Sequence, residues 1–308
     1  MTTRDGTVPD TTAVGLLRGL LRAMRPKQWV KNVLVFAAPF VAGDLLHGAV
    51  LLQALLAFVG FTLAAAGVYL VNDAKDVELD RAHPRKRHRP IASGVVPVPV
   101  AFATGFVLLL GGLAVSLSVN PQLVLVVAIY EAVQLSYCYG LKHQRVIEMC
   151  FVASGFLIRS IAGGVATSIP LSQWFLLITA FGSLFMVAGK RYAELLTIEQ
   201  AQAAEGTRRE HRAVLHGYTS SYLRFVWSLS ATAMMAMYAL WAFDIHRVSG
   251  SVWSIISMIP FVIAVLRYAV DVDSGQAEAP EDRVLGDRAL MVLGACWVAC
   301  LVLAEYVF

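Results

Sequence analysis

Charge is scarce in this chain. Only 15% of its 308 residues are Asp, Glu, Lys or Arg, whereas 58% are hydrophobic and the mean hydropathy is +0.66. Soluble domains carry about 25% charged residues, so this composition excludes an ordinary water-soluble protein. We therefore expect an integral membrane protein.

Cysteine is also scarce. The four cysteines all fall within apolar stretches, and none belongs to a C-x-x-C pair of the kind that binds metal. Cys296 and Cys300 would share a helix face, but no His or carboxylate accompanies them. We expect the cysteines to act as small apolar packing residues.

The first residues, MTTRDGTVPDTTAV, lack the continuous apolar core and the small-residue cleavage site of a signal peptide. Because this stretch is polar, we expect residues 1–15 to form a disordered lead-in. Residues 16–308 are expected to form a single transmembrane domain.

Long apolar runs recur along the rest of the chain. An α-helix needs about 20 apolar residues to cross a bilayer, and the sequence offers about nine such runs. The alternation that a transmembrane β-barrel requires is missing. We predict an all-α membrane protein with about nine transmembrane helices. The expected spans are 28–43, 49–71, 97–117, 120–139, 146–167, 171–189, 219–243, 251–270 and 286–307.

The basic residues are distributed unequally between the two sides of the membrane. If the spans alternate in direction, one side receives nearly all Lys and Arg of the connections, and the other receives almost only Arg247. Basic connections face the cytoplasm. We therefore expect a plasma-membrane protein with its N-terminus and functional site in the cytoplasm and its C-terminus outside.

A dense group of acids follows the second apolar run, in YLVNDAKDVELD. Asp73, Asp76 and Asp80 are spaced i, i+3 and i+7, so a continuous helix would place them on one face. Three carboxylates on one stripe repel one another unless a divalent cation or basic partners neutralise them. Oxygen ligands favour Mg2+ completed by substrate phosphates. These acids are candidate metal ligands, and Asn72 adds a carboxamide at the same level.

Cations follow the acids within a few residues, in the run RAHPRKRHRPIASG. One interpretation is the positive-inside rule together with contact to lipid head groups. The functional interpretation is a clamp for a polyphosphate, in which a metal bridges phosphate oxygens and cations bind the others. The candidate phosphate ligands of this run are Arg81, Arg85 and Arg87.

Three other helix ends on the basic side carry polar side chains. RPKQWVKN begins the first run, YCYGLKHQR ends the fourth, and AGKRYAEL ends the sixth. Such groups suit phosphate or metal binding, although aromatic residues at these positions are also typical of the membrane interface. The candidate residues are Lys27, Gln28, Lys31, Asn32, Tyr139, Lys142, Lys190, Arg191, Tyr192 and Glu194.

Another cation, Arg159, is expected inside the fifth span. A charged side chain at such depth is costly and is usually functional, so Arg159 is a candidate substrate ligand. A structural ion pair with Glu131 or Glu148 explains the residue equally well, and the sequence leaves both alternatives open.

Together these motifs resemble the UbiA superfamily of intramembrane prenyltransferases. The resemblance rests on RPKQWVKN, on the N-D-x-x-D-x-x-x-D pattern from Asn72 to Asp80, and on the basic run from His83 to Gly94, and it spans nearly the whole chain. It implies a helical barrel with a membrane-embedded cavity. It also implies Mg2+-dependent departure of diphosphate at a cytoplasmic cap.

The sixth helix departs from the usual pattern of this superfamily. Members that use prenyl diphosphates carry a second aspartate-rich motif there, whereas GKRYAEL has two cations and a single acid. This resembles the members that transfer a phosphoribosyl group from 5-phosphoribosyl diphosphate to decaprenyl or another polyprenyl phosphate, for arabinogalactan assembly in cell-wall biosynthesis. The extra cations suit two substrates that both carry phosphate.

The resemblance implies a mechanism as well. Mg2+ on the aspartates would stabilise the departing diphosphate, and the lipid phosphate would attack an oxocarbenium-like C1 of ribose. Because a phosphate nucleophile is already anionic, no general base is needed. The expected catalytic residues are Asp73, Asp76, Lys190 and Glu194.

Two other functions remain open. One is prenyl transfer to an aromatic acceptor, which the basic GKRYAEL motif disfavours. The other is transport of a phosphorylated solute, but transporters place polar groups near the bilayer midplane, whereas the charges here gather at helix ends. We expect no nucleic-acid partner, and the family resemblance implies a homo-oligomer such as a trimer.

Overall fold

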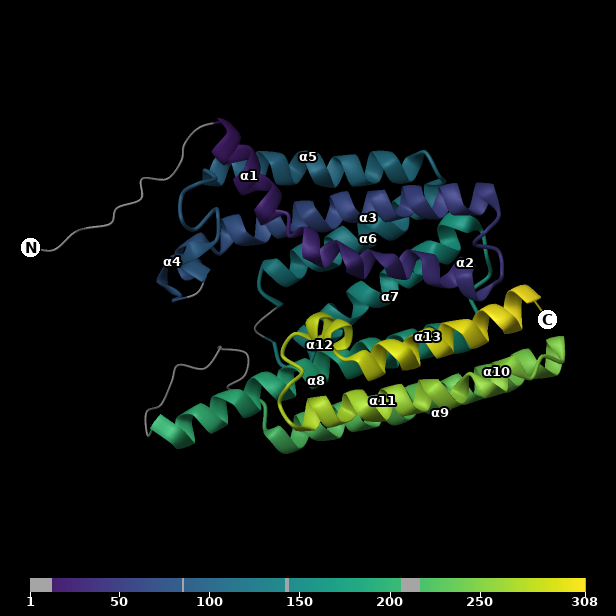
Figure 1. The fold of residues 1–308 in the computed structure, drawn as a ribbon. Helices are drawn as coiled ribbons and strands as arrows, with labels where there is room; N and C mark the ends of the chain where they lie inside the picture. The colour runs from purple at the N-terminus through teal and green to yellow at the C-terminus, as the bar shows by residue number, and fades with distance from the viewer. Residues whose placement is uncertain (1–12, 85, 142–143, 206–216, 308) are drawn as a thin grey trace, which may run out of the picture.

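The computed structural model describes residues 13–84, 86–141, 144–205 and 217–307, and within these ranges it is an all-helical bundle (Figure 1). Eight helices of this part are long and apolar enough to cross a membrane. They are α3 (Gly48–Lys75), α5 (Val98–Leu117), α6 (Pro121–Cys138), α7 (Ile147–Thr167), α8 (Gln173–Glu205), α9 (Ser220–Ser249), α10 with α11 (Trp253–Ile256 and Met258–Asp273), and α13 with η5 (Arg288–Val302 and Leu303–Val307).

Short helices lie between these long ones. They are α1 (Ala13–Ala23), η1 (Pro26–Phe36), α2 (Ala37–Val41), α4 (Val77–Ala82), η2 (Lys86–His88) and α12 (Pro280–Gly286). Because α1 begins at Ala13, the last three residues of the expected lead-in are helical. Residues 1–12 lie outside the described ranges, so the rest of that expectation stays a prediction.

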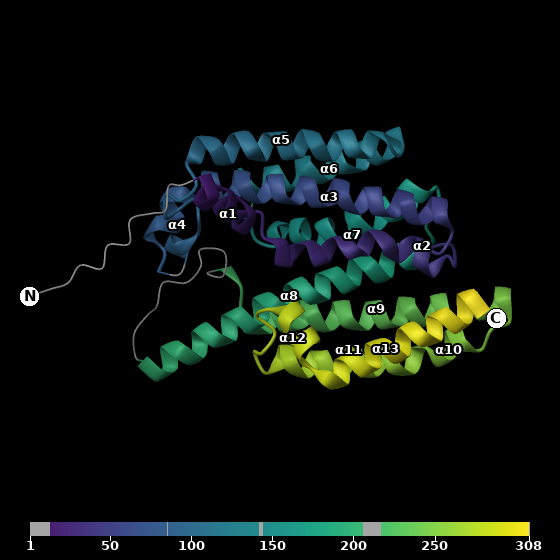
Figure 2. The ribbon, with the colours of Figure 1, turned by 45° about the horizontal axis from the view of Figure 1, so that its top comes forward.

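The first expected span, 28–43, is not an ordinary α-helix. Pro26–Phe36 is a 3-10 helix that continues into α2. A 3-10 helix rises about 2.0 Å per residue and an α-helix about 1.5 Å, so the 11 residues of η1 and the 5 of α2 extend about 30 Å, the thickness of the hydrocarbon layer. This segment crosses the bundle beside α3 and α7 (Figure 2). With the eight helices it accounts for the expected number of crossings.

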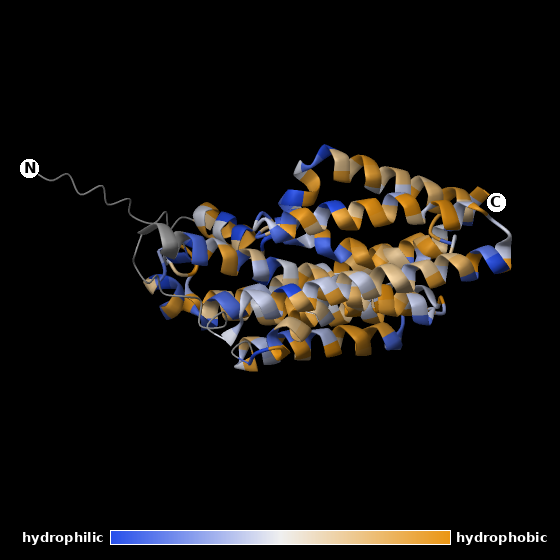
Figure 3. Ribbon diagram, turned by 90° about the horizontal axis from the view of Figure 1, so that it is seen from below, coloured by the Kyte–Doolittle hydropathy of each residue, from blue (hydrophilic) through white to orange (hydrophobic). Residues whose placement is uncertain are grey.

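The polar connections gather at one end of the bundle. α1, α4 and α12 lie at this end, and α13 finishes at the opposite end (Figure 1). Hydropathy colouring shows hydrophilic residues most often toward the same end and hydrophobic residues along the helices (Figure 3). We refer to this end, which carries Asp73 and Asp80, as the aspartate end.

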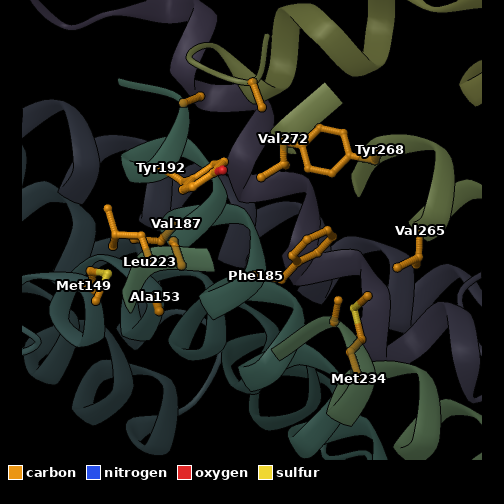
Figure 4. Close-up of a cluster of buried hydrophobic side chains, with 14 of the residues drawn as sticks. Met149, Ala153, Phe185, Val187, Tyr192, Leu223, Met234, Val265, Tyr268 and Val272 are labelled. Atoms are coloured by element: carbon orange, nitrogen blue, oxygen red, sulfur yellow. The ribbon is translucent and has the colours of Figure 1, made fainter. Parts of the chain in front are cut away.

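The largest group of buried apolar side chains joins α7, α8, α9 and α11 (Figure 4). Phe185 of α8 meets Tyr268 of α11 edge-on, with ring centroids 5.6 Å apart. Leu223 of α9 is completely buried in the same group. Because lipid tails are as apolar as these side chains, association of the helices depends on close packing and on polar contacts.

Glycines allow the closest approaches between helices. A Cβ on Gly67 of α3 would lie 2.8 Å from the carbonyl oxygen of Gly105 in α5. A Cβ on Gly163 of α7 would collide with the carbonyl oxygen of Val35, so η1 and α7 touch backbone to backbone. The absent side chain of Gly163 therefore sets the position of η1.

We predict that Gly163→Ala destabilises the protein. The added methyl group must push η1 away from α7, and overpacking of this kind costs about 1–3 kcal/mol. Thermal unfolding in detergent should show a lower midpoint for this variant. Gly294→Ala in α13 is the control, because nothing lies within 4 Å of its Cβ position, and an equal loss in both variants would contradict the prediction.

Candidate functional site

Two of the three candidate aspartates lie buried and close together where α3 gives way to α4. Asp73 and Asp80 are only 3% and 2% exposed. The guanidinium of Arg89 donates to both carboxylates, at 3.2 Å to Asp73 and 2.7 Å to Asp80. Arg25 donates to the same oxygen of Asp73, at 2.6 Å. Segments far apart in sequence thus meet at one charge cluster.

The chain breaks its helix between these two acids. α3 ends at Lys75, Asp76 caps it, and α4 begins at Val77. The predicted continuous helical face is therefore wrong, and Asp76 is half-exposed whereas Asp73 and Asp80 are buried. In the described ranges no three His, Cys, Asp or Glu side chains lie close enough together to hold a metal ion.

The donor atoms of the cluster nonetheless suit a hard divalent cation. Asp73 and Asp80 offer carboxylate oxygens, and the amide of Asn72 lies beside Asp73, with its nitrogen 3.4 Å from a carboxylate oxygen. Lys86 approaches Asp80 to 3.7 Å, so three cations surround two buried carboxylates. This positive balance favours a metal that arrives together with phosphate over a bare ion.

Arg25 has a strained backbone. Its φ of 55° and ψ of 63° lie in the left-handed region, which a residue without glycine's freedom rarely adopts. Pro26 disfavours the right-handed helical region at Arg25, and the guanidinium lies 4.9 Å from the ring centre of Tyr69 while it binds Asp73. Backbone strain of this kind persists only where surrounding contacts hold it, often at functional sites.

Neither Arg25 nor Arg89 was selected as a ligand from the sequence. Both precede a proline, Pro26 in one case and Pro90 in the other. These two Arg-Pro pairs border the acidic motif in the structure. The Arg-Pro pattern is the feature of the sequence that could have indicated both arginines as partners of the aspartates. Only the three-dimensional structure shows which acid each arginine contacts, because a run of charges in the sequence does not specify the pairs.

A second buried charge network joins α7 and α8. Arg191 donates to both carboxylate oxygens of Glu148, each at 2.9 Å, and to Glu194 at 2.7 Å. Glu148 is completely buried. One cation here faces two carboxylates, so the geometry favours a role for Arg191 in holding α7 against α8 over direct phosphate binding.

The neighbours of Arg191 point elsewhere. Lys190 is half-buried and makes no hydrogen bond or ion pair with any residue that the structure describes. Tyr192 is completely buried in the cluster of Figure 4, where its hydroxyl accepts from Arg224 and approaches Asp273 to 3.4 Å. Tyr192 therefore packs in the core and does not join the aspartates.

Arg159 is held by neutral groups. Its Nε donates to Asn32 at 2.6 Å, and its two terminal nitrogens donate to the Gly155 carbonyl at 2.6 Å and to the Tyr130 hydroxyl at 2.8 Å. Asn32 donates in turn to Thr62 at 3.0 Å. The network ties η1 to α3, α6 and α7.

The alternative ion pair of Arg159 does not form in the described structure. Glu148 is taken by Arg191, and Glu131 is buried with one oxygen lacking a partner. Phe156 lies near two cations, with its ring centre 6.0 Å from the Arg159 guanidinium and 5.7 Å from the amine of Lys31. Arg159 and Lys31 therefore both place cationic groups beside Phe156.

An apolar cavity of about 670 Å³ lies farther from the aspartate end than Arg159 and Lys31. Residues of η1, α2, α7, α8, α9, α11 and α13 line it. They include Leu34, Phe40, Ser160, Thr179, Tyr238, Phe261 and Trp297. A cavity of this size and character suits an apolar chain.

Other expected ligands lie on the rim of the aspartate end. Arg81 is exposed and donates to Glu78 at 2.9 Å, and Arg87 is also exposed. Tyr139 is exposed and lies against the amine of Lys75, 3.8 Å from its ring centre.

The start of η1 adds exposed Lys27 and half-buried Gln28 to this rim. Arg85 and Lys142 lie outside the described ranges, so their expected roles stay predictions.

The loop after α6 is fastened to the start of α9. The hydroxyl of Tyr218 accepts a hydrogen bond from the backbone N–H of Val146 at 2.6 Å. Burial raises the pKa of Tyr218 above its ordinary value. This contact closes the aspartate end between α6, α7 and α9.

Comparison with known proteins gives consistent matches. The model of the UbiA prenyltransferase family matches residues 33–304. Decaprenyl-phosphate phosphoribosyltransferase of Mycobacterium tuberculosis is 57% identical, over 92% of this chain and 93% of the relative. The protein of the same name from Mycolicibacterium smegmatis is 52% identical, over 94% and 93%.

A solved structure shares the fold. The UbiA homolog from Archaeoglobus fulgidus bound to DMAPP and Mg2+ has a TM-score of 0.69 and 16% identity, and the match covers 94% of this chain and all of that one. Divalent metal is therefore seen in a protein of the same architecture.

We predict that Arg191→Met strongly destabilises the protein, because it leaves two buried or partly buried carboxylates without their cation. Breaking a buried pair typically costs about 3–5 kcal/mol. The double variant Glu148→Met with Arg191→Met should recover part of this loss in denaturant unfolding. Arg247→Met, at an exposed pair, should change stability by less than about 1 kcal/mol. A double variant as unstable as the sum of its parts would contradict the prediction.

Proposed function

The chain belongs to the UbiA prenyltransferase family, and we propose how its site carries out the reaction. It is 57% and 52% identical, over more than nine-tenths of its length, to two named phosphoribosyltransferases. This similarity shows a transferase that moves a phosphoribosyl group onto a polyprenyl phosphate. We propose 5-phosphoribosyl diphosphate as the donor and decaprenyl phosphate as the acceptor. The structural observation that carries the mechanism is the pair of buried aspartates surrounded by cations.

The aspartate cluster binds the diphosphate of the donor in this proposal. Asp73, Asp76 and Asp80 would hold Mg2+, with Asn72 beside them. When bound, Mg2+ supplies charge stabilisation to the diphosphate as it leaves. The need for metal is supported by the carboxylate donor set and by the Mg2+-bound structure of the same fold.

Arg25 and Arg89 supply the fixed positive charge. Both bind carboxylates in the described structure, and both can turn their guanidinium groups toward incoming phosphate oxygens, which accept bidentate hydrogen bonds from arginine. The rim cations Lys27, Arg81 and Arg87, together with Arg85, add to the attraction for a donor that carries a diphosphate and a 5-phosphate.

The bond changes need positioning and charge more than proton transfer. The bond between C1 of ribose and the diphosphate oxygen breaks, and its electron pair leaves with the diphosphate. An oxygen of the lipid phosphate then bonds to C1. Since that oxygen is already anionic, no base has to remove a proton, and catalysis comes from orientation and from preorganised cations.

The apolar cavity receives the first part of the prenyl chain in this proposal. Its lining is mostly apolar, and its few side chains with a polar atom are Ser160, Thr179, Tyr238, Trp241 and Trp297, which matches the chemistry of a hydrocarbon. The reaction therefore takes place where a water-soluble donor and a membrane lipid meet.

The cellular setting belongs to the same proposal. The excess of Lys and Arg at the aspartate end supports a cytoplasmic orientation in the plasma membrane. Donors of this kind are water-soluble and would reach the site from that side. We further propose a role in arabinogalactan assembly, and self-association as a homo-oligomer through helix faces of small residues.

We predict metal-dependent transfer that requires Asp73. Purified protein in detergent should move radiolabel from 5-phosphoribosyl diphosphate to decaprenyl phosphate. Chelation with EDTA should stop the transfer and added Mg2+ should restore it. Asp73→Asn should lower the rate at least about hundredfold, since one oriented charge contributes that much to transition-state stabilisation.

Arg247→Ala, at the opposite end of the bundle, is the control and should keep the wild-type rate. Transfer that survives chelation would contradict the metal assignment. No phosphoribosyl transfer by the wild-type protein would contradict the donor.

A further inference from the structure

The donor and the acceptor bring separate phosphates to one site, and the described cations differ in what they are able to bind. Arg25 and Arg89 contact the buried aspartates, and Arg191 is held between two glutamates. These contacts leave the phosphate of the lipid to other cations. Lys31 and Lys190 do not line the apolar cavity, but each lies on the same helical face as residues that do, nearer the aspartate end.

The 3-10 form of η1 places Lys31 above the cavity. Side chains three residues apart eclipse one another in such a helix, so Lys31 shares a stripe with Leu34 and Ala37. Both of those residues line the cavity. Since η1 begins at the aspartate end, Lys31 follows this stripe toward the donor site.

The helix α8 places Lys190 on the opposite wall. Phe175 and Thr179 line the cavity, and Lys190 follows Thr179 by eleven residues, about three full turns, so both lie on the same face. The distance along the helix is about 16 Å toward the aspartate end. Lys190 is half-buried and unpaired within the described ranges.

The helix α7 connects the two walls. Ser160 lines the cavity, and Phe156 lies one turn nearer the aspartate end, with its ring 5.7 Å from the Lys31 amine. Arg159 binds Asn32, the residue next to Lys31. Arg159 is therefore a positioning residue: it fixes the register of η1 and adds positive potential without lining the cavity.

We propose that Lys31 and Lys190 bind the phosphate monoester of the polyprenyl acceptor, at the polar end of the apolar cavity, while the donor diphosphate lies at the aspartates. An apolar cavity that leads to two cations complements a molecule with a hydrocarbon chain and one terminal phosphate. A sugar diphosphate without an apolar part would gain nothing from that cavity. This assignment rests on the proposed function for the identity of the acceptor.

The test measures binding of a lipid phosphate apart from turnover. Farnesyl phosphate and farnesol are titrated into wild-type protein, Lys31→Met, Lys190→Met and the double variant in detergent. The wild type should prefer the phosphate, each single variant should weaken that preference about tenfold or more, and the double variant should bind both probes alike. Lys190→Arg, which keeps the charge, should retain part of the preference.

Donor binding and kinetics separate the two substrates. In Lys31→Met and Lys190→Met the KM for the lipid should rise while the affinity for 5-phosphoribosyl diphosphate with Mg2+ stays the same. The control Arg247→Met should alter neither. Loss of donor affinity in the lysine variants, or an unchanged preference for the phosphate probe, would overturn the assignment.

Failure of the proposed function has a different signature. A wild-type protein that prefers farnesyl phosphate but does not use 5-phosphoribosyl diphosphate would refute the donor and leave the lysine site supported. If the wild type transfers the phosphoribosyl group and the lysine variants keep its KM values, the donor is supported and the lysine site is refuted. For Arg159→Gln, a positioning role predicts a raised lipid KM with unchanged donor affinity, whereas a structural role alone would lower stability and leave both constants unchanged.

Discussion

Charges buried at one end of a membrane bundle must be neutralised by partners on other helices, and this constraint shapes the rest of the structure. Asp73 and Asp80 are held by Arg25 and Arg89, and Arg191 is held by Glu148. Taking an ion out of water costs several kcal/mol unless geometry and hydrogen bonds compensate. The same contacts that join α1, η1, α3 and the loop before α5 therefore create a site in which three cations surround two buried carboxylates.

Much of this arrangement could be predicted from the sequence. The hydrocarbon layer requires long apolar helices, and the distribution of basic residues indicates which helix ends lie on the same side of the membrane. The helical fold, the spans and the position of the acidic motif at the polar end of a long helix are of this kind. The break at Asp76 was not predictable from an i, i+3, i+7 pattern, since the pattern assumes a continuous helix. The roles of Arg25, Arg89 and Glu148 could not be predicted either, because they depend on contacts between segments that are distant in sequence. Tyr192 is buried in the core although its neighbours in sequence are polar.

The two proposed phosphate-binding regions follow from two kinds of local structure. Arginine next to proline holds the aspartates on the polar side, where α3 ends and α4 begins. Lys31 and Lys190 lie on helical faces that continue into the lining of the apolar cavity. A division of this kind allows a water-soluble donor and a lipid acceptor to enter by different routes and still meet. The buried pair of Arg191 and Glu148 joins α7 to α8.

The 3-10 geometry of η1 also limits how this segment can change during evolution. With about three residues per turn, an insertion or deletion of one residue would rotate everything beyond it by about a third of a circle. Lys31 would then lose its place above Leu34, and Val35 would no longer meet Gly163. Side chains that line the apolar cavity and are about half exposed, such as Val30 and Val33, can be exchanged for other apolar residues. The length of the segment is fixed even where its composition is not.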